Sequence, residues 1–243
     1  MSSSPTPDFG RRAATYDELR PVDENWWELY ELLVQEGDLR GRRVLDVGSG
    51  TGRFAAALGD QARVWGADPS PEMLEVARGR APGARFKEGS AEQLPFKDGW
   101  FERAVLWLVV HLLEASAFPE LHRVLAPGGR LLIATFDPSY FDAFWLNRLF
   151  PSLEAIDRAR FQTPDELRAE LDAAGFASTR FVSLSQHAGL DREAALAKIR
   201  GRHISTFDLL DEAEYAAGLA RAEAELPERI EYAVEWVVAI AER

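Results

Sequence analysis

An aspartate and a glycine-rich turn carry the clearest chemistry in the sequence. Asp46 lies within a short apolar run that breaks into three alternating glycines, Gly48, Gly50 and Gly52. Glycine at alternate positions allows positive φ and leaves no Cβ, so a flat or extended ligand can lie directly against the backbone. The Asp46 carboxylate can accept hydrogen bonds from loop N–H groups or from a ligand ammonium, and its charge would repel a pyrophosphate. The turn therefore favours a cationic ligand.

A second acidic residue stands twenty positions after the first glycine of this turn. Residues 63–67 predict a second strand, and Asp68 would lie at its carboxyl end. A carboxylate there is well placed to accept hydrogen bonds from both hydroxyls of a ribose. A dinucleotide fingerprint would have its third glycine at position 53, where this chain has Arg53. These features favour a nucleoside that carries no phosphate.

Alternating strands and helices must bring these side chains to one edge of a sheet. The run 43–47 predicts a strand that leads into the glycine turn, and the alanine-rich segment 53–58 predicts a helix whose free N–H groups face that turn. Residues 163–175 predict a helix with a threonine cap, a proline in its first turn and a final glycine. The other expected helices are 8–20, 22–36, 71–78 and 111–125, with two between 191 and 227, and the other expected strands are 84–87, 101–107, 130–136, 176–186 and 230–241.

Composition limits the class of protein. The 243 residues are 47% hydrophobic, which is enough for one α/β domain. The net charge of −12 argues against nucleic acid as the main partner, because phosphate binding needs a basic surface. The absence of cysteine excludes thiolate catalysis, and no metal is required. The sequence has neither an apolar run of about 18 residues nor the apolar core of a secretory signal, so we expect a cytoplasmic protein.

Four segments carry a family resemblance: VLDVGSGTG, GADPSPEML, EGSAEQLPFKDGWFERAV and ELHRVLAPGGRLLIATF. Over residues 9–187 the sequence resembles the class I S-adenosylmethionine-dependent methyltransferases, in the branch typified by ubiquinone and menaquinone C-methylases. The resemblance implies one α/β domain over 1–243, a three-layer, doubly wound, Rossmann-like fold. Its seven strands would run in the order 3-2-1-4-5-7-6, with strand 7 antiparallel. We expect a lid of helices over 1–40 and a helical insertion between strands 6 and 7 over 188–228.

The activity implied by this resemblance is methyl transfer from S-adenosyl-L-methionine to an oxygen, nitrogen or carbon atom of a small molecule. The other product is S-adenosyl-L-homocysteine. The displacement is in line, so the protein would contribute mainly by aligning the reactants. Two alternatives stay open: a non-catalytic S-adenosylmethionine-binding protein, and an NAD(P)-dependent oxidoreductase, which Arg53 disfavours. The expected partner is a small methyl acceptor, and the protein is expected to be a monomer or a homodimer.

Placing the family's motifs on this sequence gives the expected cofactor site. Asp46 and residues 48–52 would hold the amino acid end of the cofactor, and Asp68 would hold its ribose. Other residues would surround the adenine and the reacting methyl group. The complete expected set is Tyr16, Arg20, Asp46, Gly48, Ser49, Gly50, Gly52, Asp68, Pro69, Met73, Ser90, Ala91, Glu92, Leu106 and Trp107.

Several of these cofactor residues have more than one interpretation. Ser90 stands where the family often has an aspartate that accepts from the adenine amino group, so we expect somewhat weaker affinity. Tyr16 and Arg20 either close over the methionine end as part of a lid or belong to an ordinary surface helix. Trp107 either faces the sulfonium, in a cation–π contact, or forms a wall of the pocket.

The acceptor site is expected at the same edge of the sheet. His111 follows the central strand, and it is either a base for the acceptor's proton or an ordinary residue at a helix start. Aromatic side chains after the fifth strand would form the pocket walls. The helical insertion either caps the site or forms a dimer surface. The expected acceptor-binding residues are Tyr140, Phe144, Trp145, His203 and Ser205.

Overall fold

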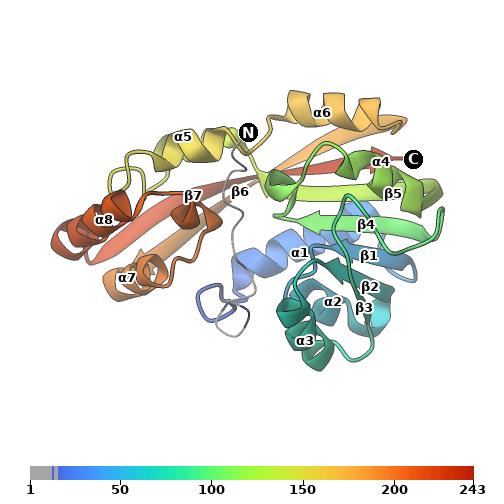
Figure 1. Cartoon of the computed structure of the whole chain (residues 1–243), viewed down its shortest axis with the longest axis horizontal. Helices are drawn as coiled ribbons and strands as arrows, with labels where there is room; N and C mark the ends of the chain where they lie inside the picture. Colours follow the sequence, from blue (N-terminus) through green and yellow to red (C-terminus); the bar gives the residue numbers. More distant parts are fainter. Residues whose placement is uncertain (1–12, 14–15) are drawn as a thin grey trace.

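The computed structural model describes residue 13 and residues 16–243, which form a twisted sheet with helices on both faces (Figure 1). The strands are β1 (Arg43–Val47), β2 (Arg63–Asp68), β3 (Arg85–Glu88), β4 (Phe101–Trp107), β5 (Leu125–Phe136), β6 (Ser178–Asp191) and β7 (Arg229–Glu242). Their order in the sheet is β3-β2-β1-β4-β5-β7-β6. The first five strands pair in parallel, and β7 is antiparallel to both of its neighbours. The expected strand order and the direction of strand 7 are confirmed.

The register of the parallel strands brings the predicted acidic residues to one edge. Asp46 on β1 lies opposite Gly66 on β2 and Val105 on β4. Asp68 ends β2 opposite Glu88, which ends β3. Because the carboxyl ends of parallel strands meet at the same edge, the loops that follow β1, β2 and β4 enclose one common space.

Helices cover both faces of the sheet. They are α1 (Glu24–Gly37), α2 (Arg53–Leu58), α3 (Pro71–Arg80), α4 (Ala117–Val124), α5 (Leu153–Arg158), α6 (Pro164–Ala173), α7 (Arg192–Arg200) and α8 (Glu212–Glu225). In Figure 1, α4 and α6 lie on one side of the sheet, and α1, α2 and α3 lie on the other. Across residues 13 and 16–243, no helix is both long enough and apolar enough to span a membrane.

Local sequence explains why α1 and α6 form where they do. The Asp23 side chain caps α1 by accepting from the Trp26 N–H at 2.9 Å, and the buried Leu29 and Leu33 lie on one face of that helix. Thr163 and Glu166 form a capping box at the start of α6, as the sequence predicted.

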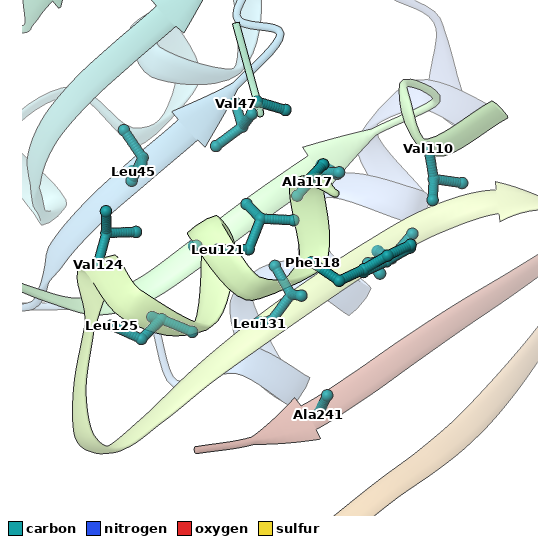
Figure 2. Packing of buried hydrophobic residues seen from close by; sticks show 14 of the residues in the cluster. Leu45, Val47, Val110, Ala117, Phe118, Leu121, Val124, Leu125, Leu131 and Ala241 are labelled. Carbon is teal, nitrogen blue, oxygen red and sulfur yellow. The ribbon is translucent and has the colours of Figure 1, made fainter. Parts of the chain in front are cut away.

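The α4 face of the sheet shows how the central core is packed. Figure 2 shows Phe118 and Leu121 of α4 in a cluster with side chains of β1 and β5. Leu45 and Leu131 are among these sheet residues, and all four side chains are fully buried. Alternate β4 residues face this core, so Leu106 lies on the α4 side while Trp107 points to the α1 side.

The last two strands extend beyond the parallel part of the sheet and support a separate group of helices. β6 and β7 stay paired over 14 residues each, from Ser178 opposite Glu242 to Asp191 opposite Arg229. Helices α5, α7 and α8 gather around the far end of this ribbon (Figure 1). A hydrophobic cluster that includes Phe150 holds them together.

Some predicted boundaries were wrong. The expected helix over 111–125 is two pieces, a 3-10 turn η3 (Val110–Leu112) and α4, because the backbone at Leu113 is extended. The fifth strand begins at Leu125 rather than at 130. β6 continues to Asp191, so the inserted helices begin after it. The expected helix over 8–20 falls mostly outside the described residues, and its last part, 16–19, is a turn.

Candidate functional site

A cavity of about 1620 Å³ opens at the carboxyl edge of the sheet. Its walls come from the loops after β1, β2, β3 and β4, from the segments after β5, and from the insertion between β6 and β7. We call the part beside β1 to β3 the donor half and the part beside β5 to β7 the acceptor half. Pockets for one small molecule usually measure about 300–1,000 Å³. This cavity therefore has room for two ligands at once.

The three glycines of the turn have two different structural roles. All three glycines have positive φ, at 69°, 50° and 75° along the chain. Gly48 and Gly50 line the cavity, and a Cβ on Gly50 would meet no heavy atom within 4 Å. Gly52 does not line it, because a Cβ there would lie 2.9 Å from Ala77 Cβ and 3.0 Å from Ala77 Cα. At this glycine α2 packs against α3, and the expected contact of Gly52 with the cofactor stays a prediction.

Asp46 presents an uncompensated carboxyl group to the donor half. Its side chain is 2% exposed, and Oδ2 has no hydrogen-bond partner among the residues described. Burial, together with the nearby charge of Asp68, raises the pKa of Asp46 to about 7. A buried carboxylate is stabilised by an opposite charge or by hydrogen-bond donors. A ligand ammonium against Oδ2 would provide both, which fits the amino acid end of the expected cofactor.

Asp68 is held in place by backbone donors. Its Oδ2 accepts from the Gly50 N–H at 2.8 Å, and its Oδ1 accepts from the Ser70 N–H at 2.9 Å. Burial raises the pKa of Asp68, and these two hydrogen bonds act in the opposite direction. A carboxylate has about four acceptor sites, so two remain for other donors such as ribose hydroxyls. The hydrogen bond from Gly50 also fixes the position of the glycine turn relative to Asp68.

The residues expected around the adenine lie together in the donor half. Pro69, Met73, Ser90, Ala91 and Glu92 all line the cavity, and Met73 is also buried in the core. The Glu92 carboxylate accepts from the Glu114 N–H at 3.3 Å. Glu92 therefore braces the loop that follows η3.

The strand β4 sends only one of its two predicted residues into the cavity. Trp107 lines the cavity and stacks on Trp26, with ring centroids 4.9 Å apart and planes 16° apart. Phe54 meets it edge-on at 5.8 Å. Leu106 is fully buried under α4 and does not line the cavity, and its expected cofactor contact stays a prediction. Aromatic rings cover Trp107 on the α1 side, which supports its interpretation as a wall.

Residues 16–20, which we call the strap, lie at the cavity wall between the glycine turn and the insertion. Tyr16 and Arg20 both line the cavity, and the Arg20 guanidinium lies 3.9 Å from the centre of the Tyr16 ring. The strap contains no helix or strand. Its side chains and backbone are bonded to the glycine turn on one side and to the insertion on the other.

His111 lines the cavity and is stacked face to face on Phe161, with ring centroids 4.2 Å apart. Its Nδ1 is buried and has no hydrogen-bond partner in the described part of the chain. Burial and the positive charge of Arg160 lower the pKa of His111 to about 3. The imidazole is therefore neutral at physiological pH, and one of its nitrogens is an acceptor.

The predicted acceptor residues all reach the cavity. Tyr140 and Phe144 are 8% exposed each, and Trp145 lies beside them. His203 and Ser205 come from the insertion and also line the cavity. The Ser205 hydroxyl accepts from Arg160 at 3.0 Å, and His203 Nδ1 lies 3.0 Å from the carbonyl oxygen of Lys198. Of the two interpretations of the insertion, a cap on the site is the one that this arrangement supports.

A polar group in the acceptor half was missed by sequence reasoning. The Thr206 hydroxyl donates to Asp157 Oδ1 at 2.5 Å and accepts from Arg160 at 3.1 Å. The Arg160 and Asp157 charges are 3.6 Å apart. Burial raises the pKa of Asp157 to about 6, while the Thr206 hydrogen bond and the Arg160 charge oppose this rise. The sequence held no signal for it, because α5 and the turn η5 (Ser205–Asp208) meet only in three dimensions.

Comparison with known proteins agrees with this architecture. Residues 45–133 match the family model described as a methyltransferase domain. A demethylmenaquinone methyltransferase from Thermus thermophilus is 35% identical over 172 residues, which cover 59% of this chain and 78% of that protein. One from Chlorobaculum tepidum is 39% identical over 132 residues, which cover 50% of this chain and 54% of that protein. The chain thus spans about half the length of that second relative.

The fold is also found in a solved structure. The YcgJ protein of Bacillus subtilis superposes with a TM-score of 0.65 at 22% identity, over 89% of this chain and 98% of that one. The strand order and the sequence relatives identify the lineage of the chain. It belongs to the class I S-adenosylmethionine-dependent methyltransferases, in the branch of the ubiquinone and menaquinone C-methylases.

Proposed function

We propose that the protein transfers a methyl group from S-adenosyl-L-methionine to a small aromatic acceptor. The observation that carries this proposal is the buried Asp46 carboxyl, whose Oδ2 is left without a partner in the described structure on the wall of a cavity large enough for two ligands. Family membership supports the same cofactor. The aromatic lining of the acceptor half supports the class of acceptor.

The donor half would hold the cofactor through three sets of residues. Asp46 would accept from the ammonium, the turn at Gly48 and Gly50 would lie against the methionine chain, and Asp68 would accept from the ribose hydroxyls. When bound, S-adenosylmethionine supplies an electrophilic methyl group, which a nucleophile takes in line while the carbon–sulfur bond breaks onto sulfur. The protein would hold the acceptor in line with the methyl group in a site with little water. Such alignment alone can lower the activation barrier by several kcal/mol.

His111 would bind the methyl-accepting substrate through a ring nitrogen that can accept a hydrogen bond. A pKa of about 3 makes His111 a weak general base, although the neutral ring can still accept a hydrogen bond. We therefore infer that His111 orients an acceptor hydroxyl or amine. Tyr140, Phe144 and Trp145 would form the walls around the acceptor ring, and the insertion would cap it.

The other two interpretations of the sequence have less support. A non-catalytic binder would be favoured by an aromatic cap without polar groups, but His203 and Ser205 line the cap here. An NAD(P) enzyme needs room for a pyrophosphate at the glycine turn. Asp46 lies beside that turn, and its charge would repel a pyrophosphate. Arg53 also stands where the dinucleotide fingerprint has its third glycine.

Calorimetry with S-adenosylmethionine, S-adenosylhomocysteine and NAD tests the cofactor, and we expect the first two to bind and NAD not to bind. The Asp68→Ala variant should lose most of the affinity for both sulfur compounds. Turnover is tested on a panel of phenols, amines and quinone precursors, by the S-adenosylhomocysteine released. The quinone precursors are included because two of the relatives are demethylmenaquinone methyltransferases. Tight cofactor binding with no turnover on any acceptor class would favour the non-catalytic alternative.

A further inference from the structure

The strap is anchored to the donor half through Asp17. Its Oδ1 accepts from the Thr51 hydroxyl at 2.9 Å and pairs with Arg53 Nε at 2.8 Å. Arg80 pairs with Oδ2 of the same carboxylate, and an Arg53 N–H donates to the Asp17 carbonyl oxygen at 2.8 Å. Thr51 directly follows Gly50 in the turn. One side chain thus ties the strap to the loop that would hold the methionine chain of the cofactor.

The other side of the strap is anchored to the insertion. The Lys198 ammonium on α7 donates to the Leu19 carbonyl oxygen, and the Arg20 guanidinium donates to the carbonyl oxygen of His203. The Leu19 side chain packs over Gly201, where an added Cβ would collide with Leu19 Cδ1. All three contacts come from one short stretch at the end of α7 and just after it.

These two sets of contacts give the strap its position. Within the strap the Arg20 N–H donates to the Asp17 carbonyl oxygen at 3.2 Å, and Arg53 on the donor side donates to the carbonyl oxygens of both Asp17 and Arg20. Since this turn belongs to no helix or strand, contacts with the donor half on one side and with the insertion on the other hold it in place. A segment held at both sides transmits a change at one side to the other. By linkage, a contact that stabilises the strap from the insertion also stabilises whatever the strap covers in the donor half.

We propose that Lys198, on the acceptor cap, is a positioning residue for the cofactor, acting through the strap and the Asp17 contacts with the glycine turn. This inference rests on the proposed function, because it assumes that S-adenosylmethionine occupies the donor half. It makes the insertion part of the cofactor site as well as a cap on the acceptor. Closing the cap and binding the cofactor then favour each other.

The test measures the Kd for S-adenosylhomocysteine by calorimetry in four proteins: wild type, Lys198→Met, Asp17→Asn and the double variant. We expect each single variant to raise the Kd by roughly five- to thirtyfold, a range typical of coupled sites. The Kd of the double variant should be little higher than that of the single variant with the higher Kd, because both changes release the same strap. Lys198→Arg, which keeps a donor, should restore most of the affinity.

The matched control is Arg200→Gln, on the same helix. Arg200 pairs with Glu223 at 2.7 Å on the surface and does not line the cavity, and no hydrogen bond or ion pair between Arg200 and residues 16–20 is found in the described structure. Its Kd should equal that of the wild type. The melting temperature of each ligand-free variant separates a loss of folding from a loss of positioning.

Three outcomes overturn the proposal in distinguishable ways. An unchanged Kd in Lys198→Met beside a raised Kd in Asp17→Asn would show that the insertion does not act on the donor half. A fully additive double variant would show that Lys198 and Asp17 act independently, so Lys198 would not act through the strap. Failure of the wild type to bind S-adenosylhomocysteine would instead remove the proposed function itself.

Discussion

Replacing Asp46 by asparagine should stabilise the ligand-free protein while removing its affinity for the cofactor. The pKa of this carboxyl is raised from 3.8 to about 7 by burial and by the charge of Asp68. A group whose pKa is higher in the folded state contributes stability that is complete below its unfolded pKa. That contribution is lost as the pH rises from about 4 through about 7.

The size of the effect follows from the shift in pKa. About three pH units at 1.36 kcal/mol each give on the order of 4 kcal/mol of stability that the wild type has lost at pH 8. Asparagine carries no charge and so avoids this loss. Its buried amide would lack a partner at the position of Oδ2, which costs about 1–3 kcal/mol. We therefore expect a net gain of roughly 1–3 kcal/mol at pH 8, and a net loss at pH 4.

Urea unfolding of the ligand-free proteins at pH 4 and pH 8 measures this difference directly. Only the difference between the variant and the wild type is interpreted, because other carboxyl groups titrate in the same range. Calorimetry should show that S-adenosylmethionine binding to the wild type strengthens as the pH rises from 6 to 8, since the ammonium needs the ionised carboxylate. A variant that is less stable than the wild type at pH 8 and binds the cofactor normally would refute the reasoning.

Three further substitutions test other parts of the site. Gly52→Ala should cost about 2–3 kcal/mol of stability, because it combines a positive φ with a clash against Ala77. Its control is Gly79→Ala in α3, where an added Cβ would meet no heavy atom within 4 Å and should cost nothing. Thermal melting compares the two variants. Ser90→Asp should lower the Kd for S-adenosylhomocysteine several-fold by adding a charged acceptor near the adenine, and an unchanged Kd would place the adenine elsewhere. His111→Gln should lower kcat on a hydroxyl or amine acceptor about tenfold with the cofactor Kd unchanged, so a loss of cofactor binding would contradict its assignment to the acceptor half.

The parts of the fold that the sequence predicted are those written in local patterns. The strand before the glycine turn, the capped helix α6 and the acidic end of β2 each depend on fewer than about fifteen neighbouring residues, and the structure has all three. The strand order came from the family resemblance rather than from any local pattern. It is confirmed by the sheet.

Distant partners decide the features that local patterns did not reveal. The packing of Gly52 against Ala77 is one of them, because Ala77 lies on another helix. The burial of Leu106 is different, since strand alternation alone places it on the opposite face from Trp107. The contact of Arg160 with Thr206 had no sequence signal, because the two residues are 46 positions apart and lie in different elements.

The position of β7 between β5 and β6 has a consequence for how the protein is made. β6 leaves the ribosome before β7, yet it has no place in the sheet until β7 arrives and pairs with both neighbours. During that interval two long strand edges have open backbone groups, which are templates for aggregation. A nascent chain can complete its donor half early, but the acceptor half is complete only after β7 has paired with β5 and β6. Slow synthesis between the two strands should therefore lower the yield of folded protein more than a delay elsewhere.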